Sequence, residues 1–288
     1  TWPMRSERGG RMISIGTNAL ASSIVLSLRP RPDGAPTTDR RGFIQSLQAE
    51  VPDALRKLQQ GAIAPVDLPQ AAIGPGMAVF SRYASVVEPD GSAMTVRSAL
   101  ARINEILDEV LSEQEGDYDD TTRFALAWYR QHGYATGVYG DADNLARARN
   151  TAVDRLDRDG VLSSRAGKVT LLRPTDLPTA YDVSLDDHTS AWEALHHLSR
   201  ILTSDGVSAA GQFLAAALDR PDGAVEADLV KELAFLLFSI AEKNGWTKDA
   251  LAFNTLATSW PDLLDASRAA ATAGPTQSQS TFDFDDED

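Results

Sequence analysis

The feature that most constrains the fold is a short run near the start, residues 24–28 (IVLSL), which is apolar without alternation. Such a run is typical of a strand that is buried on both faces, as in the sheet of an α/β domain. One strand cannot cover its own two faces or satisfy its backbone polar groups. Because no partner strands follow it, we expect the rest of this sheet to lie before Thr1, so that the sequence starts inside a domain.

The charge and the lack of cysteine exclude several classes of protein. The 288 residues carry 27 Lys and Arg against 41 Asp and Glu, a net charge of −14. This excludes a generally basic DNA-coating protein, but it leaves a local basic face possible. With no cysteine there is no disulfide, Cys-ligated zinc, iron–sulfur cluster or thiol nucleophile. The absence of cysteine also fits a cytoplasmic location, and no stretch approaches the ~20 apolar residues of a membrane span.

Between residues 33 and 120 the apolar periodicity predicts a helical region. Helices are expected over 37–60 and 95–111, where apolar residues recur at intervals of three and four. Pro52 interrupts the first, so two short helices fit as well as one. Candidate caps precede both segments: Thr37, Thr38 or Asp39 for the first, and Ser92 or Thr95 for the second.

A Gly-Pro-Gly string lies between these helices, at residues 74–76. Glycine beside a helix can form a phosphate-binding loop, but the Lys-Ser/Thr pair of a P-loop does not follow. We therefore predict a tight turn, with a ligand-binding loop as the alternative.

The stretch from 121 to 180 predicts a module that resembles a winged helix. Its expected elements are helices over 121–132, 141–148 and 150–159, then a hairpin that pairs 161–164 with 169–172. Helix-turn-helix relatives use such an order to place a helix in the major groove and a hairpin against phosphates.

The charges of this module leave its role open. Residues 140–173 hold seven basic and five acidic side chains. The carboxylates of Asp154, Asp157 and Asp159 would repel DNA phosphates if they faced them. Direct DNA contact and a structural or protein-binding role therefore both remain possible.

The remainder, 181–272, predicts a helical domain, either a bundle or a few tetratricopeptide-like hairpins. The helix expected over 225–243 is apolar enough around its circumference to lie centrally. Residues 273–288 are rich in Ser, Thr, Gln and acids, so we expect a disordered acidic tail.

No arrangement of residues predicts an active site. Glu193 and His196 have the spacing found in di-iron bundles, but a second such pair is lacking. We interpret them, with His197, as partly exposed helix residues. Eight acids within 104–120 could bind a divalent cation, but they more simply form a solvated helix end. We predict no catalytic residue, no cofactor-binding residue and no metal ligand.

Longer strings give a resemblance to a known family. They are TWPMRSE (1–7), TNALASSIVL (17–26), RPR (29–31), IAPVDL (63–68), AAIGPGMAVFSRY (71–83), DGS (90–92), MTVR (94–97), EQEGD (113–117) and SWP (259–261). These strings resemble the C-terminal part of large bacterial and archaeal adenine-specific DNA methylases, whose N-terminal region is a domain of unknown function. They are spread over nearly the whole chain except its acidic tail.

The resemblance implies that the intact protein transfers a methyl group from S-adenosylmethionine to N6 of adenine in DNA. The family's Asp-Pro-Pro-Tyr motif and its Gly-rich cofactor turn are not recognisable in this sequence. The resemblance places both motifs, and the zinc ribbon of some relatives, upstream of Thr1. On this interpretation residues 1–32 are the β remnant of a Rossmann-like methyltransferase sheet, and this chain alone binds no S-adenosylmethionine and is inactive.

The sequence thus predicts a mainly α fold with an N-terminal β remnant. The resemblance implies three partners: DNA, an upstream catalytic portion of the same protein and other subunits of a restriction-modification or phage defence system; no membrane partner is expected. Candidate phosphate contacts are Arg5, Arg8, Arg11, Arg149, Arg165 and Lys168. The alternative is a non-catalytic helical and winged-helix adaptor that binds protein.

Overall fold

The computed structural model describes residues 2–4, 23–25, 27–61, 63–113, 117–186, 188–220 and 225–273. These residues form a mainly helical fold, as predicted, with eleven α-helices and three small sheets. No helix among them is long and apolar enough to cross a membrane.

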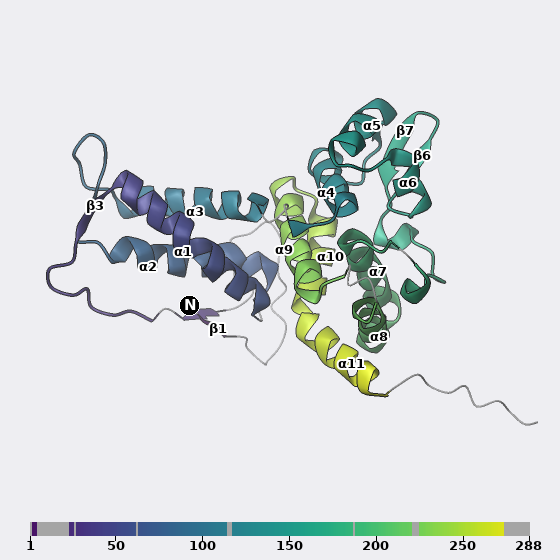
Figure 1. Ribbon diagram of the computed structural model, residues 1–288. Helices are drawn as coiled ribbons and strands as arrows, with labels where there is room; N and C mark the ends of the chain where they lie inside the picture. The colour runs from purple at the N-terminus through teal and green to yellow at the C-terminus, as the bar shows by residue number, and fades with distance from the viewer. Residues whose placement is uncertain are drawn as a thin grey trace, which may run out of the picture.

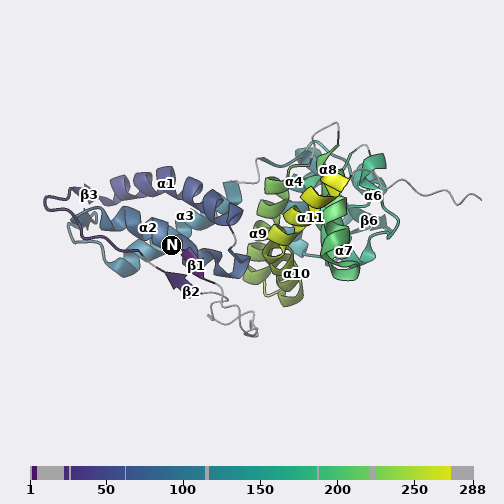
Figure 2. The same cartoon turned by 90° about the horizontal axis from the view of Figure 1, so that it is seen from below.

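The first unit is built from α1 (Arg40–Gln60), α2 (Leu68–Ser81) and α3 (Val96–Glu113), which pack against one another. They lie together at one end of the molecule (Figures 1 and 2). Two short strands, β3 (Thr37–Asp39) and β4 (Ser85–Val87), pair in parallel and contact α1 at this end.

Helix α1 is one helix, although Pro52 lies inside it. Its apolar face continues across the proline, because Leu47, Val51 and Leu55 recur at intervals of four and are buried. Asp39 is the cap that forms, and its side chain accepts a hydrogen bond of 2.7 Å from the backbone N–H of Gly42. Tertiary burial of this face therefore outweighs the local break that a proline favours.

The predicted tight turn at residues 74–76 is wrong, because these residues lie inside α2. A Cβ atom at Gly76 would come within 2.5 Å of Ile103 on α3. The glycine thus allows α2 and α3 to approach closely, and their packing decides the local structure.

The predicted strand at 24–28 is confirmed only over its first residues. Strand β2 (Ser23–Val25) pairs antiparallel with β1 (Trp2–Met4), and the described residues add no third strand to this pair. Leu28 lies beyond the strand and is 85 % exposed, so this end of the run is not buried on both faces.

A second unit has the element order helix, strand, two helices and hairpin. Its elements are α4 (Asp120–His132), β5 (Gly137–Val138), α5 (Tyr139–Ala148), α6 (Val153–Arg158), β6 (Leu162–Arg165) and β7 (Lys168–Leu171). The three strands form an antiparallel sheet in the order β5-β7-β6. The predicted hairpin is confirmed, with Ser164 opposite Val169, whereas α6 is shorter than the helix predicted over 150–159.

Five further helices complete the chain. They are α7 (Ala191–Ser204), α8 (Gly206–Leu218), α9 (Ala227–Lys243), α10 (Thr247–Thr258) and α11 (Trp260–Ala273). Helix α9 is central, as predicted: it contacts α10, α7 and α1, and it lies between the first unit and the rest of the molecule in Figure 1. The predicted tail, 273–288, lies outside the described residues except for Ala273, the last residue of α11.

A cluster of aromatic rings joins the second unit to the helices that follow it. The ring of Tyr129 on α4 lies 5.2 Å from Tyr134, 6.0 Å from Trp192, 5.1 Å from Trp246 and 6.1 Å from Phe253, centre to centre. These rings come from α4, from the loops that follow α4 and α9, and from α7 and α10, so they bury a shared core.

Candidate functional site

The predicted contact residues Arg165 and Lys168 lie together at the tip of the β6–β7 hairpin. They face each other across the two strands, and both side chains are exposed. The turn between them is Ala166-Gly167, with φ values of 51° and 73°, as a two-residue hairpin turn requires. The structure thus places two exposed cations side by side at the tip of a hairpin.

Of the other predicted phosphate contacts, the described part of the chain includes only Arg149. Arg149 follows the end of α5 and is half-buried, and its Nε atom is buried without a hydrogen-bond partner. Arg5, Arg8 and Arg11 lie outside the described residues.

The carboxylates of α6 and its C-terminal cap are partly neutralised by neighbours. Asp159 accepts from Arg155 at 3.4 Å, and Asp157 accepts a hydrogen bond of 3.0 Å from the backbone N–H of Ser164. Asp154 and Arg158 are exposed. This surface is therefore nearly balanced in charge, and the excess of positive charge lies on the hairpin.

The prediction that Glu193, His196 and His197 are partly exposed is wrong, because all three are buried. Glu193 and Ser190 form a reciprocal cap at the start of α7, and burial raises the pKa of Glu193 to about 8. His196 bonds through Nδ1 to the carbonyl oxygen of Trp192 at 2.8 Å and through Nε2 to the hydroxyl of Tyr134 at 2.7 Å. These residues are therefore part of the buried core. The described residues contain no cluster of three or more His, Asp or Glu that could hold a metal ion.

The acids of 104–120 are also structural where the structure describes their contacts. Asp119 caps α4 by accepting from the backbone N–H of Thr122 at 2.7 Å, and it also accepts from the N–H of Ala191 at 3.2 Å. Asp108 pairs with Lys243 of α9 at 2.7 Å. These contacts support the interpretation of the acidic residues as a helix end. They also join this acidic segment to α7 and α9.

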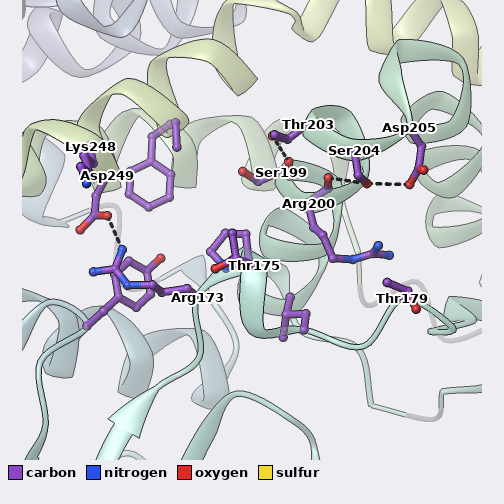
Figure 3. A pocket seen from close by; sticks show the side chains of 15 residues that line it. Arg173, Thr175, Thr179, Ser199, Arg200, Thr203, Ser204, Asp205, Lys248 and Asp249 are labelled. Carbon is purple, nitrogen blue, oxygen red and sulfur yellow. Dashed lines mark hydrogen bonds and ion pairs between the residues drawn. The ribbon is translucent and has the colours of Figure 1, made fainter.

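A cavity of about 640 Å³ begins at Arg173, shortly after the chain leaves β7. Its walls come from Tyr134, from 173–179, from the end of α7 and from the start of α10. Arg173 is held there by two contacts. It donates a hydrogen bond of 2.7 Å to Asp249 (Figure 3), and its guanidinium carbon lies 4.4 Å from the centre of the Tyr134 ring.

Two further cations line this cavity, Arg200 on α7 and Lys248 on α10, while Asp205 adds a second carboxylate to Asp249. Figure 3 shows Arg200 and Lys248 on different sides, with Thr175 between them. No pattern in the sequence predicts this cavity. Its charged residues come from three segments that are tens of positions apart, at 173, at 200–205 and at 248–249, and no motif joins these segments, so only the folded chain brings them together.

The second unit and the helices after it belong to one family. Residues 119–282 match a family described as a domain of unknown function (DUF8807), and the chain belongs to this family. The match begins at Asp119, the residue that caps α4. No curated protein and no solved structure matches the sequence significantly.

Proposed function

We propose that the unit from α4 to β7 is a winged-helix type of DNA-binding module, and that Arg165 and Lys168 bind backbone phosphates. The main observation behind this proposal is the pair of exposed cations at the tip of the β6–β7 hairpin. The element order and the sheet order β5-β7-β6 support the comparison with winged helices, which place such a hairpin against the DNA backbone.

The distribution of charge supports nucleic acid as the partner. Residues 121–173 hold nine basic and five acidic side chains, whereas the rest of the chain holds 18 basic and 36 acidic ones. A basic module on an acidic protein would orient itself toward a polyanion, because the remaining surface is repelled.

The resemblance to adenine-specific DNA methylases suggests the larger protein in which this module would act. In that setting the chain is the C-terminal portion of an S-adenosylmethionine-dependent adenine N6-methyltransferase and holds target DNA. The catalytic and cofactor motifs would belong to an upstream catalytic portion, and the β1–β2 pair would be the end of its Rossmann-like sheet. Other defence-system subunits are further partners in this setting.

The rival function is a protein-binding adaptor, and a specific observation favours it. Asp154 is exposed on α6, the helix that a winged helix would place toward the major groove, and α6 is short. A carboxylate there suits a basic surface of a partner protein better than it suits phosphates.

The test is equilibrium binding of a fluorescent 25-base-pair duplex at low salt by the whole chain and by R165A/K168A. Loss of two phosphate contacts should weaken binding about tenfold or more. The matched control is K57A/R97A, which removes two exposed cations from α1 and α3. The control should bind as the wild type does. Absence of duplex binding by the wild type, or equal binding by R165A/K168A, would favour the adaptor.

A further inference from the structure

The side chain of Arg200 is the most informative group in the cavity beside β7. Its Nε atom is buried and has no hydrogen-bond partner. A buried donor of a charged group without an acceptor is costly, and it calls for a partner. Figure 3 shows the guanidinium group extended along the cavity, toward Thr179.

The rest of the cavity determines what could supply that acceptor. Arg173 is occupied by Asp249 and by the ring of Tyr134. Lys248 is exposed at the start of α10. With three cations against two carboxylates, the cavity has a net positive charge within a chain of charge −14. An anionic acceptor is therefore favoured over a neutral one.

The shape and the apolar lining limit the ligand to a small organic molecule. A volume of about 640 Å³ lies within the range of small-molecule sites. Part of the wall is apolar, from Pro174, Leu177, Ala252 and Phe253. Beyond the proposed DNA contact, we infer that this cavity binds a small organic anion, whose carboxylate or phosphate accepts from Arg200 and whose apolar body packs on Pro174 and Ala252. A guanidinium group binds either anion through two parallel hydrogen bonds.

The cavity also lies between two parts of the fold. Tyr134 and Arg173 flank the β5-β7-β6 sheet in the chain, whereas Arg200 and Lys248 belong to α7 and α10. A ligand that contacts both sides would stabilise the position of the hairpin module against these helices.

In the experiment, the whole chain is titrated with phenyl phosphate and with 3-phenylpropionate. Binding is measured by calorimetry and by the change in the NMR signal of the Arg200 Nε–H group. The controls are 3-phenylpropanol, which lacks the charge, and inorganic phosphate, which lacks the apolar body. We expect saturable binding of at least one aromatic anion with a dissociation constant of ~1 mM or tighter, and binding at least about tenfold weaker for both controls. The tighter of the two anions identifies the acid group.

Two variants make the proposal falsifiable. R200M should weaken binding at least about tenfold, whereas R97M, at an exposed site on α3, should leave it unchanged. A252W keeps every charge but fills the exposed wall of the cavity, and it should also abolish binding. The absence of saturable binding of both anions, or equal binding by R200M or A252W, would overturn the inference. The duplex-binding test with R165A/K168A is independent of these results, so the DNA-binding proposal and the anion-binding inference can fail separately.

Discussion

At the scale of single residues, the buried histidines couple folding to pH. Burial lowers the pKa of His196 to about 3 and that of His197 to about 4. The unfolded chain therefore takes up protons near the ordinary value of 6.5, while the folded chain resists them. Stability contributed by each neutral histidine is present above pH 6.5 and is lost as the pH falls toward the folded-state value.

The first prediction is that H196Q loses part of this pH dependence. Between pH 7 and pH 5 the free energy of unfolding of the wild type should fall by about 1–2 kcal/mol more than that of H196Q, measured by urea unfolding. The matched control is H188Q, because His188 is exposed. Its pH dependence should equal that of the wild type.

Other titratable and charged groups face these histidines and also affect the pH dependence of stability. The informative quantity is therefore the difference in pH dependence between the wild type and the variant. Glu193 has a raised pKa of about 8, so its contribution is lost as the pH rises through that value and opposes the histidines. Asp186 and Arg200 act on His197 with opposite signs. If H196Q and the wild type have the same slope, His196 is not held neutral by the fold.

At the scale of elements, the close approach of α2 and α3 depends on Gly76. The second prediction is that G76A lowers the free energy of unfolding by about 1–3 kcal/mol, because the added methyl group would overlap the side chain of Ile103. The control is G140A in α5, where no atom lies within 4 Å of the added Cβ atom. It should be neutral or slightly stabilising, and thermal unfolding compares the two. Equal stability of G76A and G140A would contradict the packing.

The same elements show how far the sequence predicts the fold. The helix over 95–111 was predictable, because its periodicity is a local property and the predicted cap Thr95 accepts from the backbone N–H of Ser98. The Gly-Pro-Gly string was not, since Ile103 lies far along the chain from Gly76 and only tertiary packing brings them together. The hairpin residues Arg165 and Lys168 were predictable for the opposite reason: a two-residue turn fixes their register locally.

At the scale of the whole molecule, Lys231 of α9 joins the first unit to the rest. Its Nζ atom donates to the carbonyl oxygens of Gln60 at 3.0 Å and Gly61 at 2.9 Å, at the end of α1. The side chain is buried, and burial lowers its pKa to about 8. One cation thus satisfies two carbonyl groups of a different unit.

The third prediction is that K231M destabilises the chain by about 1–3 kcal/mol, because it leaves these carbonyl groups without their donor. K243M removes a lysine from the same helix, where it forms an exposed pair with Asp108. It should cost less than about 1 kcal/mol in the same urea measurement. A cost for K231M no greater than that for K243M would show that Lys231 does not hold the units together.

The cavity residues could not have been predicted at any smaller scale. Tyr134, Arg173, Arg200 and Lys248 lie on four separate segments, and each resembles an ordinary surface residue in the sequence. Their relation follows from the packing of α7 against residues 174–176 and against α10. A site assembled in this way carries no periodicity or motif.

The salt dependence of duplex binding tests the central claim most directly. If Arg165 and Lys168 each neutralise one phosphate, the slope of log K against log salt concentration should be about 1.8 shallower for R165A/K168A than for the wild type. The slope for K57A/R97A should match the wild type. Identical slopes for R165A/K168A and the wild type would contradict the assignment of the hairpin as the phosphate-binding element.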